Sequence, residues 1–117
     1  GQKIDIFVGD IFQVSREMLS PVDAVYDRAA LVALPAEVRQ RYPAHLMEIT
    51  ATAPQLLICY EYDQALQAGP PFSVGRKELH RHYRESYRLT LLDSADVAGG
   101  LKGKCPAKEN VWLLNKR

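Results

Sequence analysis

Two apolar runs separated by a helical pattern constrain the fold of this 117-residue chain most strongly. Residues 22–26 read VDAVY, and residues 56–60 read LLICY. The second run is apolar almost throughout, as expected of a strand that is covered on both faces. Between the two runs, apolar side chains recur at spacings of four, four and three residues from Val38 to Ile49, which is the period of one helix face. A strand, a helix and a second strand in this order predict a right-handed crossover between parallel strands of an α/β sheet.

The helical regions have boundaries that the sequence marks. A helical segment is predicted from Pro35 to about Thr52, with a kink or break at Pro43, because proline has no amide hydrogen to donate within a helix. A second helix of about ten residues is predicted after a Gly- and Pro-rich segment, with Ser73 as its N-cap.

Three further strands complete the predicted sheet. Residues 4–8 and 87–91 alternate between apolar and polar side chains, and residues 111–114 supply a further apolar run. Residues 94–108 contain Gly, Lys and Pro without a clear period and are predicted to form a loop. The last two strands are expected to form an antiparallel pair that finishes the sheet. This order is typical of the second half of a doubly wound α/β fold.

Charge and composition argue against several classes of partner. The 15 Lys and Arg residues nearly balance the 14 Asp and Glu residues, so the net charge is +1 and no nucleic acid partner is expected. No apolar stretch approaches the roughly 18 residues that span a bilayer, so no membrane partner is expected and a cytoplasmic location is the default. The two cysteines make no disulfide framework. His80 and His82 lack further ligands at suitable spacing, so no metal site is expected either.

The carboxyl end of the strand predicted over residues 22–26 carries the main candidate for ligand binding. Arg28 follows this strand, and open α/β sheets bind their ligands at the carboxyl ends of strands. Its guanidinium offers five donors to a carboxylate or to an anionic substrate, and the alternative is an ion pair with Asp27. The loop GPPFSV at residues 69–74 is either a rigid wall of the same site, in which Phe72 projects over an aromatic ring, or a simple connector.

Several runs of this sequence resemble one enzyme family, the bacterial thiopurine S-methyltransferases, which are class I S-adenosylmethionine-dependent methyltransferases. The resemblance covers nearly the whole chain, and its most specific elements are DRAALVALP and GPPFSV. The runs that carry it are GDIF (9–12), VDAVYDRAALVALPAEVRQRY (22–42), LLICYEYDQ (56–64), GPPFSV (69–74) and ENVWLL (109–114).

The resemblance implies a Rossmann-like α/β fold with a seven-stranded sheet of order 3-2-1-4-5-7-6. This chain would supply strands 3 to 7, including the terminal antiparallel strand. Residues 1–117 are then expected to be the C-terminal part of a single methyltransferase domain. The N-terminal half, with strands 1 and 2 and the glycine-bearing cofactor loop, is expected to lie upstream, because no such loop occurs in these residues.

The resemblance also implies how S-adenosylmethionine is held. The Asp10 carboxylate is expected to accept a hydrogen bond from the adenine amino group, the Ile11 amide to reach a ring nitrogen, and Phe12 to cover the adenine face. From the residues alone, Asp10 reads equally well as a turn former after Gly9, and Phe12 as a core residue. Arg28 is expected to contact the methyl donor.

The expected function is methyl transfer from S-adenosylmethionine to the thiol of an aromatic or heterocyclic substrate. No catalytic side chain is expected, because a thiopurine thiol is acidic enough to arrive as its anion and needs no general base. Phe72 and Arg28 are the expected substrate contacts. Bacterial members of the resembling family are also associated with selenium and tellurium compounds.

Two alternatives stay open at this point. The chain is either a non-catalytic fragment that needs its N-terminal half, or another small-molecule-binding α/β protein, such as a dinucleotide enzyme. In the fragment case, sheet strands lack neighbours, and we expect self-association through exposed sheet edges.

Overall fold

The computed structural model of this chain describes residues 15, 17, 21–28, 31–101, 103 and 105–117. The strand predicted over residues 4–8 lies outside these described residues, as do the candidate cofactor contacts Asp10, Ile11 and Phe12. None of the described helices is long and apolar enough to cross a membrane.

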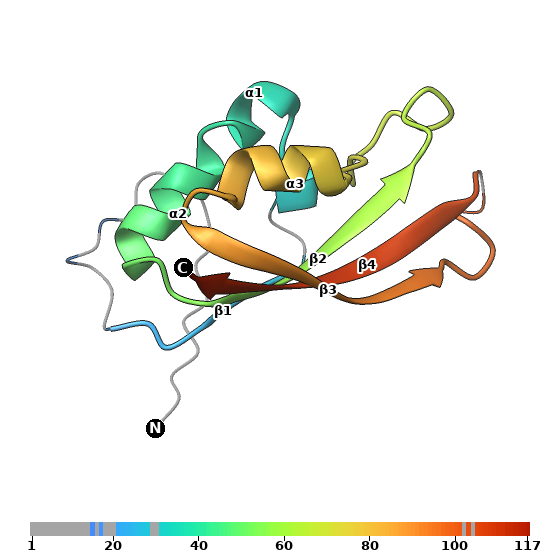
Figure 1. Cartoon of the computed structure of the whole chain (residues 1–117). Coiled ribbons are helices and arrows are strands. Elements are labelled where there is room, and N and C mark those ends of the chain that lie inside the picture. Colours follow the sequence, from blue (N-terminus) through green and yellow to red (C-terminus); the bar gives the residue numbers. More distant parts are fainter. Residues whose placement is uncertain (1–14, 16, 18–20, 29–30, 102, 104) are drawn as a thin grey trace.

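The described strands form one open, mixed sheet in the order β1-β2-β4-β3 (Figure 1). The strands are β1 (Val25–Asp27), β2 (Gln55–Tyr62), β3 (Tyr87–Asp96) and β4 (Ala107–Lys116). β1 runs parallel to β2, whereas β4 lies between β2 and β3 and is antiparallel to both. The sheet therefore has the parallel crossover and the terminal antiparallel strand that the sequence predicts, and it is consistent with half of a Rossmann-like methyltransferase sheet.

The strands depart from their predicted bounds in two places. The strand predicted over residues 22–26 begins only at Val25 and continues to Asp27. The loop predicted over residues 94–108 is wrong at both ends, because β3 runs on to Asp96 and β4 already starts at Ala107. From Thr90 to Asp96 every residue of β3 is exposed. The end of this strand therefore leaves no alternation of buried apolar side chains in the sequence. Backbone pairing with β4 defines the strand instead.

The helical segment predicted over residues 35–52 is divided into two helices, α1 (Ala36–Arg39) and α2 (Tyr42–Thr50). The break is confirmed, but it lies just before Pro43. Pro43 then lies in the first turn of α2. Backbone amides in the first turn of a helix have no acceptor within that helix, so proline removes no helical hydrogen bond there. A short 3-10 helix, η3 (Leu31–Ala33), precedes α1 and connects it to β1.

The helix after the proline-rich loop, α3 (Arg76–Tyr83), starts later than predicted. Its N-cap is Gly75, so the prediction of Ser73 as the cap is wrong. The Ser73 hydroxyl instead accepts a hydrogen bond from the Tyr62 amide at 2.9 Å. Ser73 thereby attaches the loop to the end of β2, and the N-cap of the helix lies two residues beyond this contact.

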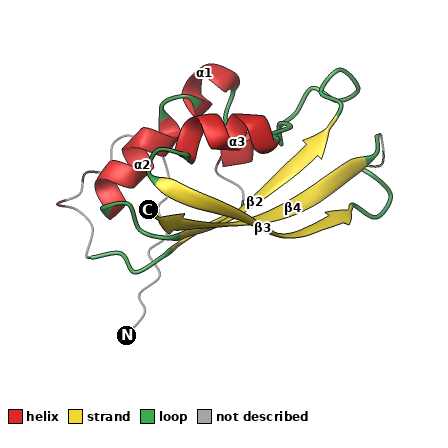
Figure 2. Cartoon of the chain, in the orientation of Figure 1, coloured by secondary structure: helices red, strands yellow, loops and turns green. Residues whose placement is uncertain are grey.

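The helices α1, α2 and α3 all lie on one face of the sheet (Figure 2). The main core fills the space between these two layers. The sheet contributes Leu57, Cys59, Trp112 and Leu114, and the helices contribute Leu46, Ile49, Leu79 and Tyr83. Both Cys59 and Cys105 are buried and free, so neither forms a disulfide.

The opposite face of the sheet has no described helix over it. Register and alternation place Tyr26 and Leu56 side by side on this face, with Leu113 next to Leu56 on β4. The Tyr26 side chain is 61% exposed. On this face Ile58 is nevertheless buried, with 9% of its surface exposed. The expectation that β2 is covered on both faces therefore holds at Ile58, although none of the described helices lies over this face.

Candidate active site

A cavity of about 530 Å³ opens where β1 and β2 end. It is the edge at which open α/β sheets bind ligands. The described lining residues are Arg28, Val32, Ala33, Tyr60, Pro70 and Pro71. The cavity thus brings together Arg28 and the proline-rich loop, two features that lie far apart in the sequence and that sequence reasoning assigned to one site.

Arg28 and Asp27 are neighbours in the chain but face different surroundings. Arg28 is exposed and lines the cavity. The Asp27 carboxylate is buried, where it accepts hydrogen bonds from the Tyr42 hydroxyl at 3.0 Å and from the Leu31 amide at 3.3 Å. Asp27 therefore fixes the start of η3, whose next residues form one wall of the cavity. Burial, together with the charge of Asp27, raises the pKa of Tyr42, so its phenol stays protonated and keeps donating.

Tyr60 is a lining residue that the sequence analysis did not single out. Burial raises the pKa of the Tyr60 phenol, and the neighbouring Glu109 carboxylate raises it further, while the charge of Arg28 acts in the opposite direction. Tyr60 is consequently a neutral hydrogen-bond donor at physiological pH, within the electrostatic reach of Arg28. Its place as the last residue of LLICY, at the ligand edge of the sheet, was the available signal.

The proline-rich loop of residues 69–74 is attached to η3 and β2 by its backbone. The Phe72 amide donates to the Val32 carbonyl at 2.6 Å, and the Val74 amide donates to the Tyr60 carbonyl at 2.9 Å. The Tyr62 hydroxyl donates to the Pro71 carbonyl at 2.6 Å. The peptide bonds before Pro70 and Pro71 are both cis. The two prolines therefore present a fixed apolar surface to the cavity, as a rigid wall would.

Phe72 turns toward the helical layer. The guanidinium carbon of Arg39 lies 5.4 Å from the centroid of the Phe72 ring. A Cβ placed on Gly69 would approach the same ring to 2.9 Å, so the ring also packs closely against this glycine. Phe72 is not among the described lining residues of the cavity. A direct contact between Phe72 and a substrate stays a prediction.

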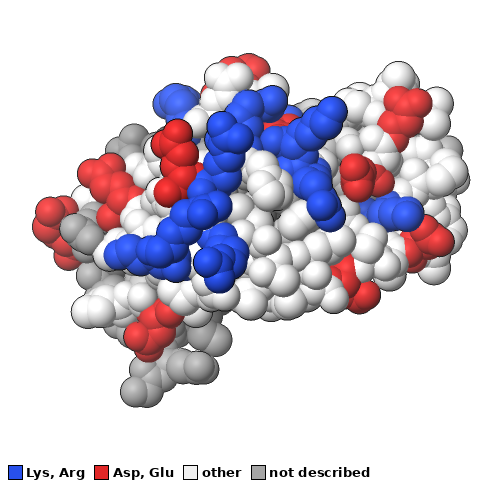
Figure 3. Space-filling view, in the orientation of Figure 1, with Lys and Arg blue, Asp and Glu red and all other residues white. Residues whose placement is uncertain are grey.

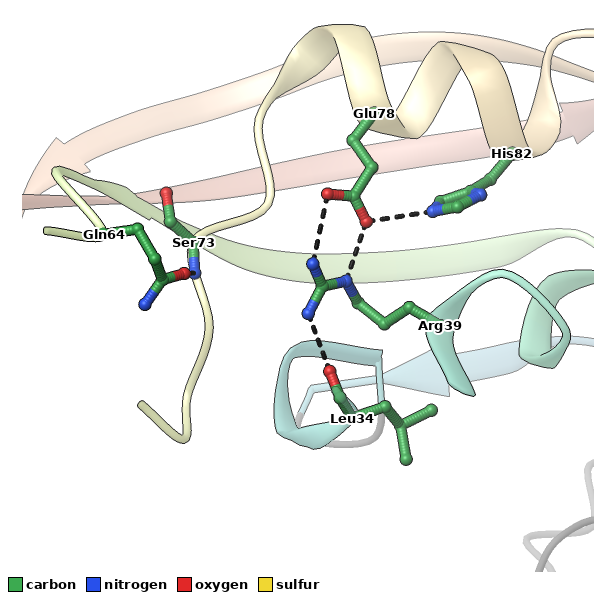
Figure 4. A network of polar contacts seen from close by, with 6 residues as sticks. All are labelled: Leu34, Arg39, Gln64, Ser73, Glu78 and His82. Atoms are coloured by element: carbon green, nitrogen blue, oxygen red, sulfur yellow. Dashed lines mark hydrogen bonds and ion pairs between the residues drawn. The ribbon is translucent and has the colours of Figure 1, made fainter. Parts of the chain in front are cut away.

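Behind this loop lies a buried charge network that the sequence did not reveal (Figure 4). The Arg39 guanidinium donates to the Glu78 carboxylate, with Nε–Oε2 at 2.7 Å and Nη2–Oε1 at 3.3 Å. His82 Nε2 contacts the same carboxylate at 2.9 Å. Burial alone would raise the pKa of Glu78, but the bonds from His82 and Arg39 lower it from 4.5 to about 2.

The run RKELHRHYR (76–84), which spans the helix that carries Glu78, is typical in sequence of a solvated basic face. This holds for Arg76, Lys77 and Arg81, which are exposed, and Figure 3 shows Lys and Arg side chains gathered over α3. It is wrong for His82, whose side chain is only 7% exposed. Within the described residues, no group of three or more His, Cys, Asp or Glu side chains is arranged to hold a metal ion.

A second cavity, of about 740 Å³, lies beside the β3–β4 hairpin at the same end of β2. Its lining includes Glu61, Asp96 and Lys108 together with hairpin glycines. Tyr62 also lines this second cavity. Its hydroxyl donates a hydrogen bond to the carbonyl of Pro71, which lines the first cavity. Two cavities therefore lie at the ligand edge of the described sheet, and Tyr62 contacts the walls of both.

Comparison with known proteins identifies relatives over the whole chain. The family model described as "Thiopurine S-methyltransferase (TPMT)" matches residues 1–117. A protein of Xanthobacter autotrophicus named thiopurine S-methyltransferase is 58% identical over 97% of this chain and is covered over 53% of its own length. Relatives of the same name from Gluconobacter oxydans (50% identical, 96% of this chain, 51% of the relative) and Acinetobacter baylyi (48%, 98% and 53%) are similar to it as well. The chain spans about half the length of the curated relatives it matches.

Proposed function

The chain belongs to the thiopurine S-methyltransferase family, and from this premise we propose that it forms part of an enzyme that methylates the sulfur of an aromatic or heterocyclic thiol. The observation that supports this most directly is the cavity in which Arg28 faces the Pro70–Pro71 wall at the ends of β1 and β2. S-adenosylmethionine, when bound, supplies a methyl group on a sulfonium centre, and the thiolate sulfur takes that methyl as the old carbon–sulfur bond breaks.

The described residues fit one side of such a reaction. Arg28 offers planar donors to the carboxylate of the methyl donor or to the anionic acceptor. Tyr60 offers a neutral hydroxyl, and Pro70 and Pro71 offer a flat apolar surface against which an aromatic ring can pack. The contribution of these residues is to bind and orient, which accounts for much of the acceleration when two reactants must meet in line.

The remaining contacts of this proposal involve residues outside the described part of the chain. Asp10, Ile11 and Phe12 are proposed to hold the adenine of S-adenosylmethionine. Selenium and tellurium nucleophiles are proposed as further acceptors, since they are soft and react with the same methyl group. No general base is assigned, because the thiol acceptor enters as its anion.

We further propose that residues encoded before Gly1 complete the domain. The described helices cover one face of the sheet, Tyr26 is exposed on the other, and the chain spans about half of each relative. In an α/β domain, a sheet face that exposes an aromatic side chain such as Tyr26 is normally covered by a second layer of helices. Below, the extended chain means Gly1–Arg117 together with the residues encoded before Gly1.

Calorimetry with S-adenosylhomocysteine tests both proposals. We expect binding by the extended chain, little or none by Gly1–Arg117 alone, and no heat from NAD in either case. Absence of binding by the extended chain would refute the methyltransferase proposal, and binding of NAD would favour the dinucleotide alternative. Equal binding by both chains would contradict the need for upstream residues.

Methylation of a thiopurine by the extended chain tests the role of Arg28. Arg28→Met is expected to lower kcat/KM by roughly tenfold or more, the effect of losing one charge-assisted hydrogen bond. Arg88→Met is the matched control, because Arg88 is an exposed arginine on β3, away from the cavity. Equal activity of the two variants would remove Arg28 from the site.

A further inference from the structure

Arg39 joins three segments of the fold through one buried guanidinium (Figure 4). Its Nη1 donates to the Leu34 carbonyl at 2.7 Å, directly after η3. Its Nε and Nη2 donate to Glu78 on α3. The guanidinium carbon lies over the Phe72 ring, 5.4 Å from the ring centroid. These three segments meet at Arg39, which is the last residue of α1.

Two of these segments are walls of the candidate active site. Val32 and Ala33 of η3 line the cavity, and so do Pro70 and Pro71, which come directly before Phe72. The Phe72 amide also donates to the Val32 carbonyl, so the two walls touch each other at Phe72. Arg39 contacts this junction at Phe72 and is not among the described lining residues of the cavity. A shift of the guanidinium would therefore change how far the proline wall stands from Arg28.

The geometry of the network requires arginine and not merely a positive charge. One planar fork donates in two directions, to a carboxylate and to a backbone carbonyl, while its central carbon lies over an aromatic ring. A lysine ammonium is a compact point charge that cannot reproduce this arrangement. The burial of Arg39 and the bidentate contact to Glu78 hold the fork in one orientation.

We propose that Arg39 is a positioning residue for the thiol acceptor. It sets the place of the Pro70–Pro71 wall through Phe72, and it touches neither substrate nor methyl donor. This inference rests on the function proposed above. It assigns to Arg39 an effect on the binding of the acceptor that is separate from its contribution to stability.

The test uses the extended chain and three sets of variants. Arg39→Lys keeps the charge and removes the fork. The double variant Arg39→Met/Glu78→Met removes both members of the Arg39–Glu78 ion pair, so that neither of these two charges is left without the other. Arg76→Met is the matched control, because the guanidinium carbon of Arg76 also lies over an aromatic ring, 5.5 Å from the Trp112 centroid, but that ring belongs to β4 and neither residue is among the described lining residues of the cavity.

Three quantities are measured for each variant: KM and kcat with a thiopurine, Kd for S-adenosylhomocysteine, and the urea midpoint of unfolding. We expect Arg39→Lys to raise KM for the thiol by roughly tenfold, while kcat and Kd for S-adenosylhomocysteine change by less than about twofold. The double variant is expected to recover the wild-type midpoint and to keep the raised KM. Arg76→Met is expected to leave KM unchanged. A double variant with both a wild-type midpoint and a wild-type KM would show that Arg39 is only structural and would overturn the inference.

Hydrogen exchange gives a readout that needs no activity. In Arg39→Lys, the Phe72 amide is expected to exchange about ten times faster, while the Leu57 amide inside β2 keeps its wild-type rate. If the wild-type extended chain does not methylate thiols, the proposed function fails, and this exchange measurement still decides whether Arg39 positions the loop. Unchanged exchange at Phe72 would overturn the inference whatever the activity.

Discussion

At the scale of single residues, the buried polar groups differ in how well they are paired. The Asp27 carboxylate accepts from Tyr42 and from the Leu31 amide, so its contacts connect β1 with η3 and α2. The Tyr83 hydroxyl, although buried in the same core, has no hydrogen-bond partner within the described residues. A buried acceptor that loses its donor is costly, whereas removal of an unpaired hydroxyl is not. The two tyrosines therefore make a matched pair.

Tyr42→Phe is expected to lower the free energy of unfolding by about 1–3 kcal/mol, because it leaves a buried carboxylate oxygen of Asp27 without its donor. Tyr83→Phe is expected to change it by less than about 0.5 kcal/mol or to raise it. Urea denaturation of the extended chain measures both. Equal losses in the two variants would mean that packing, and not the hydrogen bond, accounts for the effect.

The depressed pKa of Glu78 predicts a dependence of stability on pH. The folded pKa, about 2, lies below the ordinary value of 4.5, so the contribution of the ionised carboxyl is fully present above pH 4.5. It is lost as the pH falls from 4.5 toward 2. We expect the difference in urea midpoint between wild type and Glu78→Gln to shrink over this window. A constant difference from pH 6 to pH 2.5 would contradict the role of the Arg39 and His82 contacts.

The candidate site was predictable where it depends on position along a strand. Arg28 follows a strand, and residues 69–74 contain two prolines, so both features are visible in the sequence itself. The pair of Arg39 and Glu78 was not predictable, because its members are 39 positions apart and each resembles an ordinary charge on a helix surface. Only the packing of α1 against α3 makes their charges buried and paired.

At the scale of elements, the β3–β4 hairpin depends on a tight approach at Gly100. Gly99 and Gly100 both have left-handed backbones, with φ of +75° and +77°. A Cβ on Gly100 would collide with the carbonyl oxygen of Cys105, whereas a Cβ on Gly99 would meet nothing within 4 Å. The Leu101 amide donates to the same Cys105 carbonyl at 2.7 Å. The backbone of the hairpin therefore packs closely against Cys105 at Gly100, whereas Gly99 has open space around it.

Gly99→Ala is expected to cost about 1 kcal/mol from backbone strain alone. Gly100→Ala adds a clash with backbone and is expected to cost about 1–3 kcal/mol more. The Val97 amide, which donates to the Ala107 carbonyl, is a local probe of the hairpin. Its hydrogen exchange should accelerate in Gly100→Ala much more than in Gly99→Ala. Similar rates in the two variants would mean that the close approach is unimportant.

Elements with one buried face were predicted well, and elements without one were not. Buried positions such as Tyr42, Leu46 and Ile49 leave a helical period in the sequence because they all pack on one layer. The outer half of β3 is exposed, so hydrogen bonds to β4 fix its length without leaving a side-chain pattern. For the same reason the predicted loop over residues 94–108 was too long at both ends.

At the scale of the whole molecule, the described sheet is covered by helices on one face. The other face exposes Tyr26, and β1 pairs with β2 as its neighbour in the described sheet. Apolar surface beside an open strand edge favours association with another chain. Gly1–Arg117 on its own is therefore expected to associate, whereas the extended chain is expected to bury this face.

Tyr26→Ser is expected to reduce the association of Gly1–Arg117, because it removes the most exposed aromatic side chain of that face. Leu66→Ser is the matched control, since Leu66 is 60% exposed but lies in the loop after β2. Sedimentation velocity over a range of concentrations measures the oligomer distribution of each. A monomeric wild-type chain, or an equal effect of the two substitutions, would contradict this expectation.

The central position of β4 has a consequence for synthesis in the cell. Among the described strands β4 is translated last, yet it is the strand that links β3 to β2. Until these ten residues leave the ribosome, β3 has no partner among the described strands and the hairpin cannot form. A premature stop codon at Ala107 would remove residues 107–117 and so separate β3 from the other described strands, and the four-stranded sheet can therefore form only after β4 has been made.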